Sequence, residues 1–247
     1  MHVTVLIRVY NRKDFVDAAL DSVIAQDYHD WDALVVDDGS TDGSGEAVKS
    51  RMSDGRIQLI QMKHTGCAAA AAMGIERARG PVVTDLDSDD KLMPDSLSTV
   101  MPAFEKNPHL GYVWTNWVDS TGDKGTSDFL PKETTLFEAL VAGWWRASAQ
   151  RFYKKEFYMQ SEKLDTSIPY AEDLQLALLI SKTGCDTLHI PKVTYWRRIH
   201  PNRIQNEHPA EVLKCWGLVR QKIIDQALAS GTRRGKLKKV LDRIRSS

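Results

Sequence analysis

Two clusters of acidic residues in the N-terminal part of the chain each follow a short apolar run. Val35-Val36 leads into Asp37-Asp38-Gly39-Ser40-Thr41-Asp42, and the run 82–86 leads into Asp87-Ser88-Asp89-Asp90. Carboxylates crowded at the end of a buried strand repel one another and lose hydration, so they need hydrogen-bond donors or cations nearby. Because ligands bind at the carboxyl ends of strands in an α/β sheet, the clusters indicate a site for a ligand with donor groups and for a divalent cation.

The Asp-x-Asp spacing of Asp87 and Asp89 suits a sugar-nucleotide site. One carboxylate can accept hydrogen bonds from ribose hydroxyls while the other binds a hard divalent cation that neutralises the departing diphosphate. Acidic triplets also occur by chance in turns, so the spacing alone is weak. Its position at a predicted strand end, after a second acidic strand end, makes the functional interpretation the stronger one.

The residues around these clusters alternate between strand and helix patterns. We expect strands over 3–9, 33–36, 57–60 and 82–86, and helices over 13–24, 43–52 and 68–78. Asn11 is a candidate cap for the first helix. This alternation predicts a mostly parallel sheet with right-handed crossovers and helices on both faces, a Rossmann-like α/β fold. Tyr10, Asp38 and Asp87 then lie just past strand ends and converge on one rim.

The rest of the chain continues with mixed patterns. We expect a helix over 94–106 that has Pro94 in its first turn, and the sequence also indicates a strand over 111–117 and a polar loop over 122–131. Further helices are predicted over 136–145, 174–182 and 209–247, the last with a break at Gly231. The segment 187–197 resembles one or two short strands around Pro191, and Phe152-Tyr153 is extended.

The composition is that of a soluble globular protein. The 247 residues are 42% hydrophobic and 27% charged, and 33 basic residues balance 33 acidic ones, so net charge predicts no partnership with nucleic acid. The three cysteines are widely spaced and form no CxxC pair, which favours a reducing compartment over a disulfide framework. We see neither a signal peptide nor an 18-residue apolar stretch, and we expect a cytoplasmic protein.

The C-terminal segment is strongly basic. From Arg233 to Arg245 there are seven basic residues against one acidic residue, Asp242. Apolar residues recur there at helical spacing: Leu237, Val240, Leu241 and Ile244. Two interpretations remain open, a helix that packs on the protein body and an interfacial helix that contacts anionic lipid at the inner membrane face.

The motifs together resemble the inverting family 2 glycosyltransferases, which have the GT-A fold. The resemblance extends from Val3 to about Gln205 and rests on the order and spacing of several blocks. These blocks are Val9-Tyr10-Asn11-Arg12, Ser22–Gln26, Val35–Asp42, Gly66–Gly74, Asp87–Asp90 with Met93-Pro94-Asp95, Glu172-Asp173, and Tyr195–His200.

The resemblance implies roles for single residues. Asp38 would read the uracil ring of a UDP-sugar, Tyr10 would pack near the base, and Asp87 would hold the ribose side. Asp89 would bind Mn²⁺ or Mg²⁺, a duty that Asp90 could share. A further role would fall to His200, near the metal or the diphosphate.

The general base would come from Glu172-Asp173, which opens the apolar helix predicted over 174–182. Inversion needs a carboxylate that removes a proton from the acceptor hydroxyl as it attacks the anomeric carbon. Acidic residues are also common in first helical turns for structural reasons, and only the family resemblance favours Asp173 as the base. We expect the helix N-terminus to lower the pKa of Asp173.

Two departures from the family pattern concern the nucleotide. Arg8 replaces the usual proline before the Tyr-Asn pair, and Ala70-Ala71-Ala72-Met73-Gly74 lacks the common arginine and asparagine. We expect Arg8 to compensate with a phosphate or base contact.

Other residues are more ambiguous. Trp144-Trp145 could stack on an acceptor sugar, Cys67 is expected to pack, and His64 and His189 are expected to be structural or exposed.

The sequence thus predicts a metal-dependent inverting glycosyltransferase with a nucleotide-sugar donor, UDP being the expected nucleotide. The hydroxyl acceptor, a glycan or a lipid-linked sugar, stays open. We assign 1–110 to donor binding, 111–205 to acceptor binding and catalysis, and 206–247 to a C-terminal helical extension. The alternatives are a sugar nucleotidyltransferase, which would need a glycine-rich phosphate loop near the N-terminus, and a non-catalytic nucleotide-sugar-binding module. A P-loop NTPase is excluded because its motif is absent.

Overall fold

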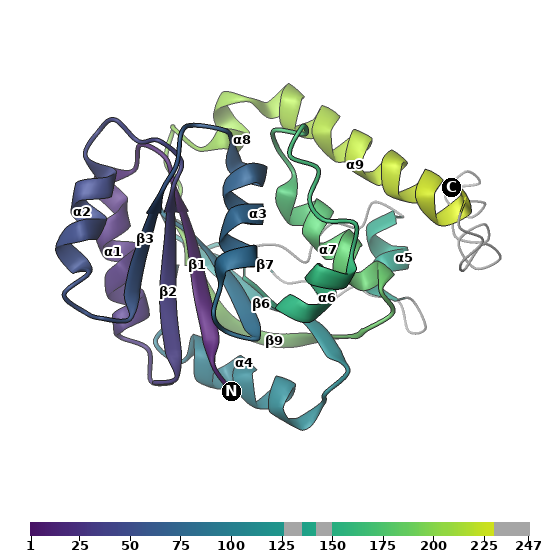
Figure 1. Cartoon of the computed structure of the whole chain (residues 1–247), viewed down its shortest axis with the longest axis horizontal. Helices are drawn as coiled ribbons and strands as arrows, with labels where there is room; N and C mark the ends of the chain where they lie inside the picture. The colour runs from purple at the N-terminus through teal and green to yellow at the C-terminus, as the bar shows by residue number, and fades with distance from the viewer. Residues whose placement is uncertain (126–134, 142–149, 230–247) are drawn as a thin grey trace.

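The computed structural model describes residues 1–125, 135–141 and 150–229. Strands and helices alternate through the first part of the chain, as the sequence predicts (Figure 1). These elements are β1 (Val3–Val9), α1 (Lys13–Ile24), β2 (Trp31–Asp37), α2 (Ser44–Arg51), β3 (Ile57–Gln61), α3 (Cys67–Arg77) and β4 (Val82–Asp87).

The second part of the chain adds strands to the same sheet and packs most of its helices on one side. Its strands are β5 (Lys91–Leu92), β6 (Leu110–Asp119), β7 (Lys124–Gly125), β8 (Arg151–Lys154) and β9 (Asp186–Arg197). Its helices are α4 (Ser96–Lys106), α5 (Leu136–Val141), α6 (Lys155–Gln160), α7 (Glu172–Lys182), α8 (Ile204–Glu207) and α9 (Pro209–Ala229). Pro94 therefore precedes α4, and the expectation that it occupies the first helical turn is wrong.

The described strands form one nine-stranded mixed sheet with the order β3-β2-β1-β4-β8-β6-β9-β5, and β7 pairs with β6. The strands β1 to β4 are parallel, while β8 lies antiparallel between β4 and β6. β6 and β9 pair in parallel. The predicted α/β architecture with flanking helices is confirmed, and the insertion of β8 beside β4 is a feature that the sequence pattern did not indicate.

Side-chain alternation along β1 and β4 divides the core between the two faces of the sheet. Val3, Val5, Ile7 and Val9 pack with α1, α2 and α4, whereas Leu6 packs on the opposite face with α3 and α7. Arg8 follows the same alternation as Leu6 and therefore points toward α3 and α7. Gly74 permits α3 to approach closely, because a Cβ there would lie 2.2 Å from Leu6 Cδ1.

One local expectation needs correction, and one open alternative is decided. Asn11 does not cap α1, because the helix begins after Arg12 without a side-chain cap bond, and Asn11 Oδ1 instead accepts a 2.9 Å hydrogen bond from the Thr41 amide. Pro191 does not divide β9 into two strands. Its missing N–H is accommodated by a register shift, where Thr115 pairs with Ile190 and Asn116 pairs with Val193.

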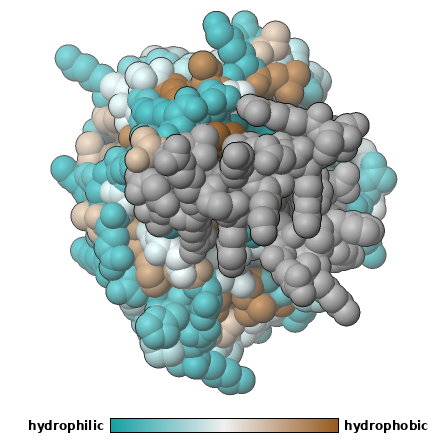
Figure 2. Space-filling view, turned by 90° about the vertical axis from the view of Figure 1, so that its right-hand side faces the viewer, coloured by the Kyte–Doolittle hydropathy of each residue, from teal (hydrophilic) through white to brown (hydrophobic). Residues whose placement is uncertain are grey.

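The C-terminal helix α9 runs across the top of the molecule in Figure 1, beyond α7. Its inner face reaches the core through Cys215, Val219 and Ile223, and Leu213 and Leu218 are exposed. Polar and apolar residues are interspersed on the side of the molecule that Figure 2 shows. None of the described helices combines the length and apolar character needed to cross a bilayer.

Candidate active site

A cavity of about 590 Å³ lies at the carboxyl ends of β1, β2 and β4, next to the first turn of α7. It gathers seven of the eight site residues that the sequence predicts: Arg8, Tyr10, Asp38, Asp87, Asp89, Glu172 and Asp173. The eighth, His200, contacts Asp89 directly. Residues far apart in the chain thus share one cavity because the parallel strands end at the same edge.

The base-binding candidates Tyr10 and Asp38 lie at the end of the cavity formed by β1 and β2. The carboxylate of Asp38 accepts hydrogen bonds from the backbone amides of Thr65 at 2.8 Å and Gly66 at 2.9 Å. His64 stacks on Tyr10, with ring centroids 4.1 Å apart. Asp38 therefore shapes the loop that carries His64. The His64 side chain lines the cavity and is 54% exposed, which agrees with the expectation of a structural or exposed residue.

Arg8 joins the two sides of the cavity. Its guanidinium Nη1 lies 2.5 Å from Glu172 Oε1, and its Nη2 lies 3.2 Å from Asp87 Oδ1. The side chain is only 8% exposed. Burial by itself would lower the pKa of Arg8, but the surrounding Cys67 and carboxylates raise that pKa well above its ordinary value. Arg8 is therefore a buried cation that links the end of β4 to α7.

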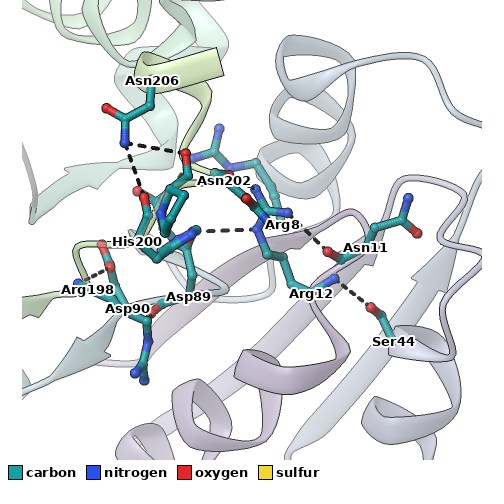
Figure 3. A network of polar contacts seen from close by, with 12 residues as sticks. Arg8, Asn11, Arg12, Ser44, Asp89, Asp90, Arg198, His200, Asn202 and Asn206 are labelled. Atoms are coloured by element: carbon teal, nitrogen blue, oxygen red, sulfur yellow. Dashed lines mark hydrogen bonds and ion pairs between the residues drawn. The ribbon is translucent and has the colours of Figure 1, made fainter. Parts of the chain in front are cut away.

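The two predicted metal ligands meet across 111 residues of sequence. His200 Nε2 lies 2.9 Å from Asp89 Oδ2, and Arg12 Nε lies 3.5 Å from the same oxygen. Figure 3 shows His200 and Arg12 close to Asp89. Arg198 Nε also donates a 3.0 Å hydrogen bond to the Asp89 carbonyl oxygen. Two arginine side chains therefore lie beside Asp89.

The donor set at Asp89 suits a partly protein-bound cation. A carboxylate oxygen and an imidazole nitrogen are acceptable ligands for Mn²⁺, while Mg²⁺ prefers oxygen alone. Among the described residues, no group of three or more His, Cys, Asp and Glu side chains is arranged to hold a metal ion. An ion bound by Asp89 and His200 would therefore need further ligands from the diphosphate and from water.

Asp90 lies next to this pair and also lines the cavity. Its carboxylate accepts a 2.7 Å hydrogen bond from the Arg198 amide and is almost fully buried. Burial and the neighbouring carboxylates Asp87 and Asp89 raise the pKa of Asp90 to about 8. These contacts tie the turn after β4 to the segment after β9.

Asp173 lines the cavity, where it accepts one hydrogen bond and lies near one cation. Its Oδ1 accepts a 2.7 Å hydrogen bond from the Leu174 amide, and its Oδ2 lies 3.7 Å from Arg151 Nη1. Burial raises the pKa of Asp173 to about 6, with Arg151 opposing and Glu172 adding to the change. Our expectation that the helix N-terminus lowers this pKa is wrong, because burial beside other carboxylates outweighs the helix dipole.

Glu172 and Asp173 are adjacent in sequence but differ in ionisation. Burial opposes the charge of Glu172, yet its contact with Arg8 keeps its pKa below the ordinary value. The pKa of Asp173 is raised instead. A pair of carboxylates whose pKa values are driven apart is a common arrangement at catalytic sites, with one member fixed as an anion and the other able to exchange a proton.

The outer wall of the cavity comes from residues to which the sequence assigned no role. Tyr170 stacks on His208 with ring centroids 5.6 Å apart, and Val212 and Trp216 of α9 line the same wall. Arg203 adds a cation. The C-terminal extension is therefore part of the site. Trp144 and Trp145, the predicted acceptor contacts, lie outside the described residues, as does the basic segment after Gly231.

Comparison with known proteins identifies a family that the chain matches. The family model described as Glycosyl transferase family 2 matches residues 4–166. Glycosyltransferase GlyA of Streptococcus pneumoniae is 41% identical over 100 residues, which are 40% of this chain and 14% of GlyA. The chain spans 14% to 17% of the length of the curated relatives that match it at 34% identity or above.

Solved structures share the fold at low sequence identity. S. aureus TarS 1–349 in complex with UDP-GlcNAc has a TM-score of 0.77 and 16% identity, covering 99% of this chain and 71% of that one. Mannosyltransferase PcManGT from Pyrobaculum calidifontis, solved with GDP-Man and Mn²⁺, has a TM-score of 0.63 and 19% identity, covering 98% and 79%. With the family match over 4–166, these likenesses confirm the GT-A fold, and the chain belongs to glycosyl transferase family 2.

Proposed function

We propose that this protein is a metal-dependent inverting glycosyltransferase that moves a sugar from a nucleotide diphosphate to a hydroxyl acceptor. One observation carries the proposal: the carboxylate of Asp173, with a pKa raised to about 6, shares a cavity with Asp89, which His200 contacts. A proton acceptor and a phosphate-binding edge in one cavity are what inverting transfer requires. Family membership supports the reaction class.

The proposed donor is a UDP-sugar. Support comes from the UDP-GlcNAc complex of TarS, which shares the fold. Tyr10 and His64 offer aromatic rings at the end of the cavity where the base would lie, and Asp38 orders the loop beside them. We assign Asp87 to the ribose, Glu172 to an indirect role through Arg8, and Arg8 itself to the diphosphate or base.

In the proposed reaction, the acceptor hydroxyl attacks the anomeric carbon from the side opposite the diphosphate. The new C–O bond forms as the bond to the diphosphate oxygen breaks, and Asp173 takes the hydroxyl proton. Inversion follows because a single displacement occurs on one face. Arg12 lines the cavity beside Asp89 and would offset the charge of the departing phosphates. When bound at Asp89 and His200, Mn²⁺ or Mg²⁺ would supply further neutralisation of the diphosphate.

The division of labour along the chain is also part of the proposal. Residues 1–110 would bind the nucleotide sugar, 111–205 would bind the acceptor and supply the base, and 206–247 would form the C-terminal extension. The acceptor would be a glycan or a lipid-linked sugar. The enzyme would act in the cytoplasm, with contact to the inner membrane face through the basic C-terminal segment as the arrangement suited to a lipid-linked acceptor.

Two rival functions are disfavoured by the residues present. A sugar nucleotidyltransferase needs a glycine-rich phosphate loop near the N-terminus, and 3–12 contains no glycine. A non-catalytic binding module has no need for a buried carboxylate with a raised pKa, yet Asp173 has one.

The proposal is tested with a panel of nucleotide sugars in thermal-shift experiments with and without Mn²⁺. A donor at about 100 times its Kd should add about 2.7 kcal/mol of stability. We expect the largest stabilisation from a UDP-sugar with Mn²⁺ present. NMR of the transferred product then reports the anomeric configuration. Equal stabilisation by all nucleotides, or a product with retained configuration, would contradict the proposal.

A further inference from the structure

Two buried arginines connect strand β4 to the first turn of α7 in the same way. Arg8 joins Asp87 to Glu172, at 3.2 and 2.5 Å. Arg151 joins Asp85 to Asp173, at 3.0 and 3.7 Å. The Arg151 side chain is 5% exposed, so it is enclosed as fully as Arg8.

The sheet topology explains why the two connections are parallel. β1 and β8 are the two neighbours of β4, and each contributes one arginine. Asp85 and Asp87 are two residues apart on β4 and so face the same side of the sheet. Thr84 pairs with Phe152, which places Arg151 beside Asp85, while Arg8 pairs with Asp87. Two successive residues of α7 then meet the two guanidinium groups.

The two contacts of Arg151, with Asp85 and with Asp173, differ in strength. Arg151 Nε donates a 3.0 Å hydrogen bond to Asp85 Oδ2, and Tyr153 donates a 3.2 Å hydrogen bond to the other oxygen of Asp85. The distance of 3.7 Å from Arg151 to Asp173 is too long for a hydrogen bond. Arg151 therefore gives its strong contact to Asp85 and only an electrostatic one to Asp173.

We propose that Asp85 and Arg151 are positioning residues for Asp173, with Asp85 holding Arg151 back so that it orients the base without forming a hydrogen bond to it. A closer arginine would keep Asp173 permanently ionised and weaken it as a proton acceptor. Without any arginine, a larger fraction of the Asp173 carboxylate would be protonated at neutral pH. The inference deepens the proposed function and rests on Asp173 being the base.

The groups that face Asp173 come from several elements. They are Arg151 on β8, Glu172 on α7 itself, Asp87 on β4 and Tyr112 on β6. Because burial and these carboxylates already favour the protonated form, Arg151 is the charged group that opposes it, together with the Leu174 amide. Removing Arg151 and removing the charge of Asp85 should therefore change the protonation of Asp173 in opposite directions.

The test is a carboxyl ¹³C NMR titration of the ligand-free, aspartate-labelled full chain, with Asp173 assigned through Asp173→Asn. We expect Arg151→Gln to raise the pKa of Asp173 by about 1 or more, and Asp85→Asn to lower it by about 1, the scale of one neighbouring charge. Lys192→Gln is the control, since Lys192 pairs with Asp95 at the exposed surface. Shifts of equal sign, or the same shift in the control, would overturn the proposal.

If Arg151→Gln does not fold, Arg151→Lys keeps the buried charge but replaces the planar fork with one ammonium group that cannot bridge both carboxylates. An unchanged Asp173 titration in Arg151→Lys would contradict the proposal. The titration needs neither donor nor acceptor, so it stays readable if the transfer reaction itself is not found. Where turnover is measured, the acidic limb of its pH profile should move with the NMR value.

Discussion

Replacing the proposed base by its amide should stabilise the protein at neutral pH. The pKa of Asp173 is about 6 in the folded protein, against an ordinary value of 3.8. Because the folded-state value is raised, the stabilisation that Asp173 contributes is full below pH 3.8 and is lost as the pH rises through about 6. The difference between the two pKa values corresponds to a loss on the order of 3 kcal/mol of unfolding free energy above about pH 6. The side chain is 23% exposed, so the measured effect should fall at about 1–3 kcal/mol.

The assay compares the unfolding free energy of the parent and Asp173→Asn by chemical denaturation between pH 4 and pH 8. We expect the variant to gain stability relative to the parent as the pH rises through about 6. Asp14→Asn is the matched control, since Asp14 also lies in the first turn of a helix, α1, but is exposed. A difference that is independent of pH, or that grows toward acid, would refute the reasoning, because a lowered pKa would produce the latter.

The same variant should lose its chemistry. Loss of a general base costs about a hundredfold or more in kcat, while binding of UDP should change little because Asp173 is placed on the acceptor side. A stabilised protein that still binds the donor and no longer turns over would show that the charge of Asp173 lowers stability but is needed for catalysis. Joint loss of donor affinity and turnover would instead make Asp173 a ligand-binding carboxylate.

Four further outcomes follow. Asp89→Asn should abolish turnover and remove the Mn²⁺-dependent part of UDP stabilisation in a thermal shift, and full activity in excess EDTA would remove the metal from the mechanism. Asp38→Ala should weaken UDP binding measured by calorimetry without altering its Mn²⁺ dependence, and an unchanged affinity would show that the uracil lies elsewhere. Arg8→Ala should cost about 1–3 kcal/mol of UDP affinity and about 3–5 kcal/mol of unfolding free energy, since it leaves Glu172 and Asp87 without their cation. A chain ending at Gly231 should sediment less with anionic liposomes than the full chain, and equal negligible binding would identify a packing helix.

The sequence by itself determined the features of this protein that depend on the pattern of residues close together in the chain. Alternating apolar patterns located the strands and helices of the first hundred residues or so, because burial on a sheet or helix face imposes those periods. The acidic clusters at strand ends indicated the site edge, since parallel strands bring their carboxyl ends together. The order of motifs indicated the family that the comparison with known proteins confirmed.

Only the tertiary structure decided how distant charges are combined. Nothing in the sequence shows that β8 enters the sheet beside β4, and this insertion brings Arg151 to Asp85 and Asp173. Nor does it show that α9 closes the cavity with Val212 and Trp216. The pKa of Asp173 was misjudged for the same reason: local sequence reports the helix N-terminus, whereas burial and the neighbouring charges are set by segments that meet only in the folded chain.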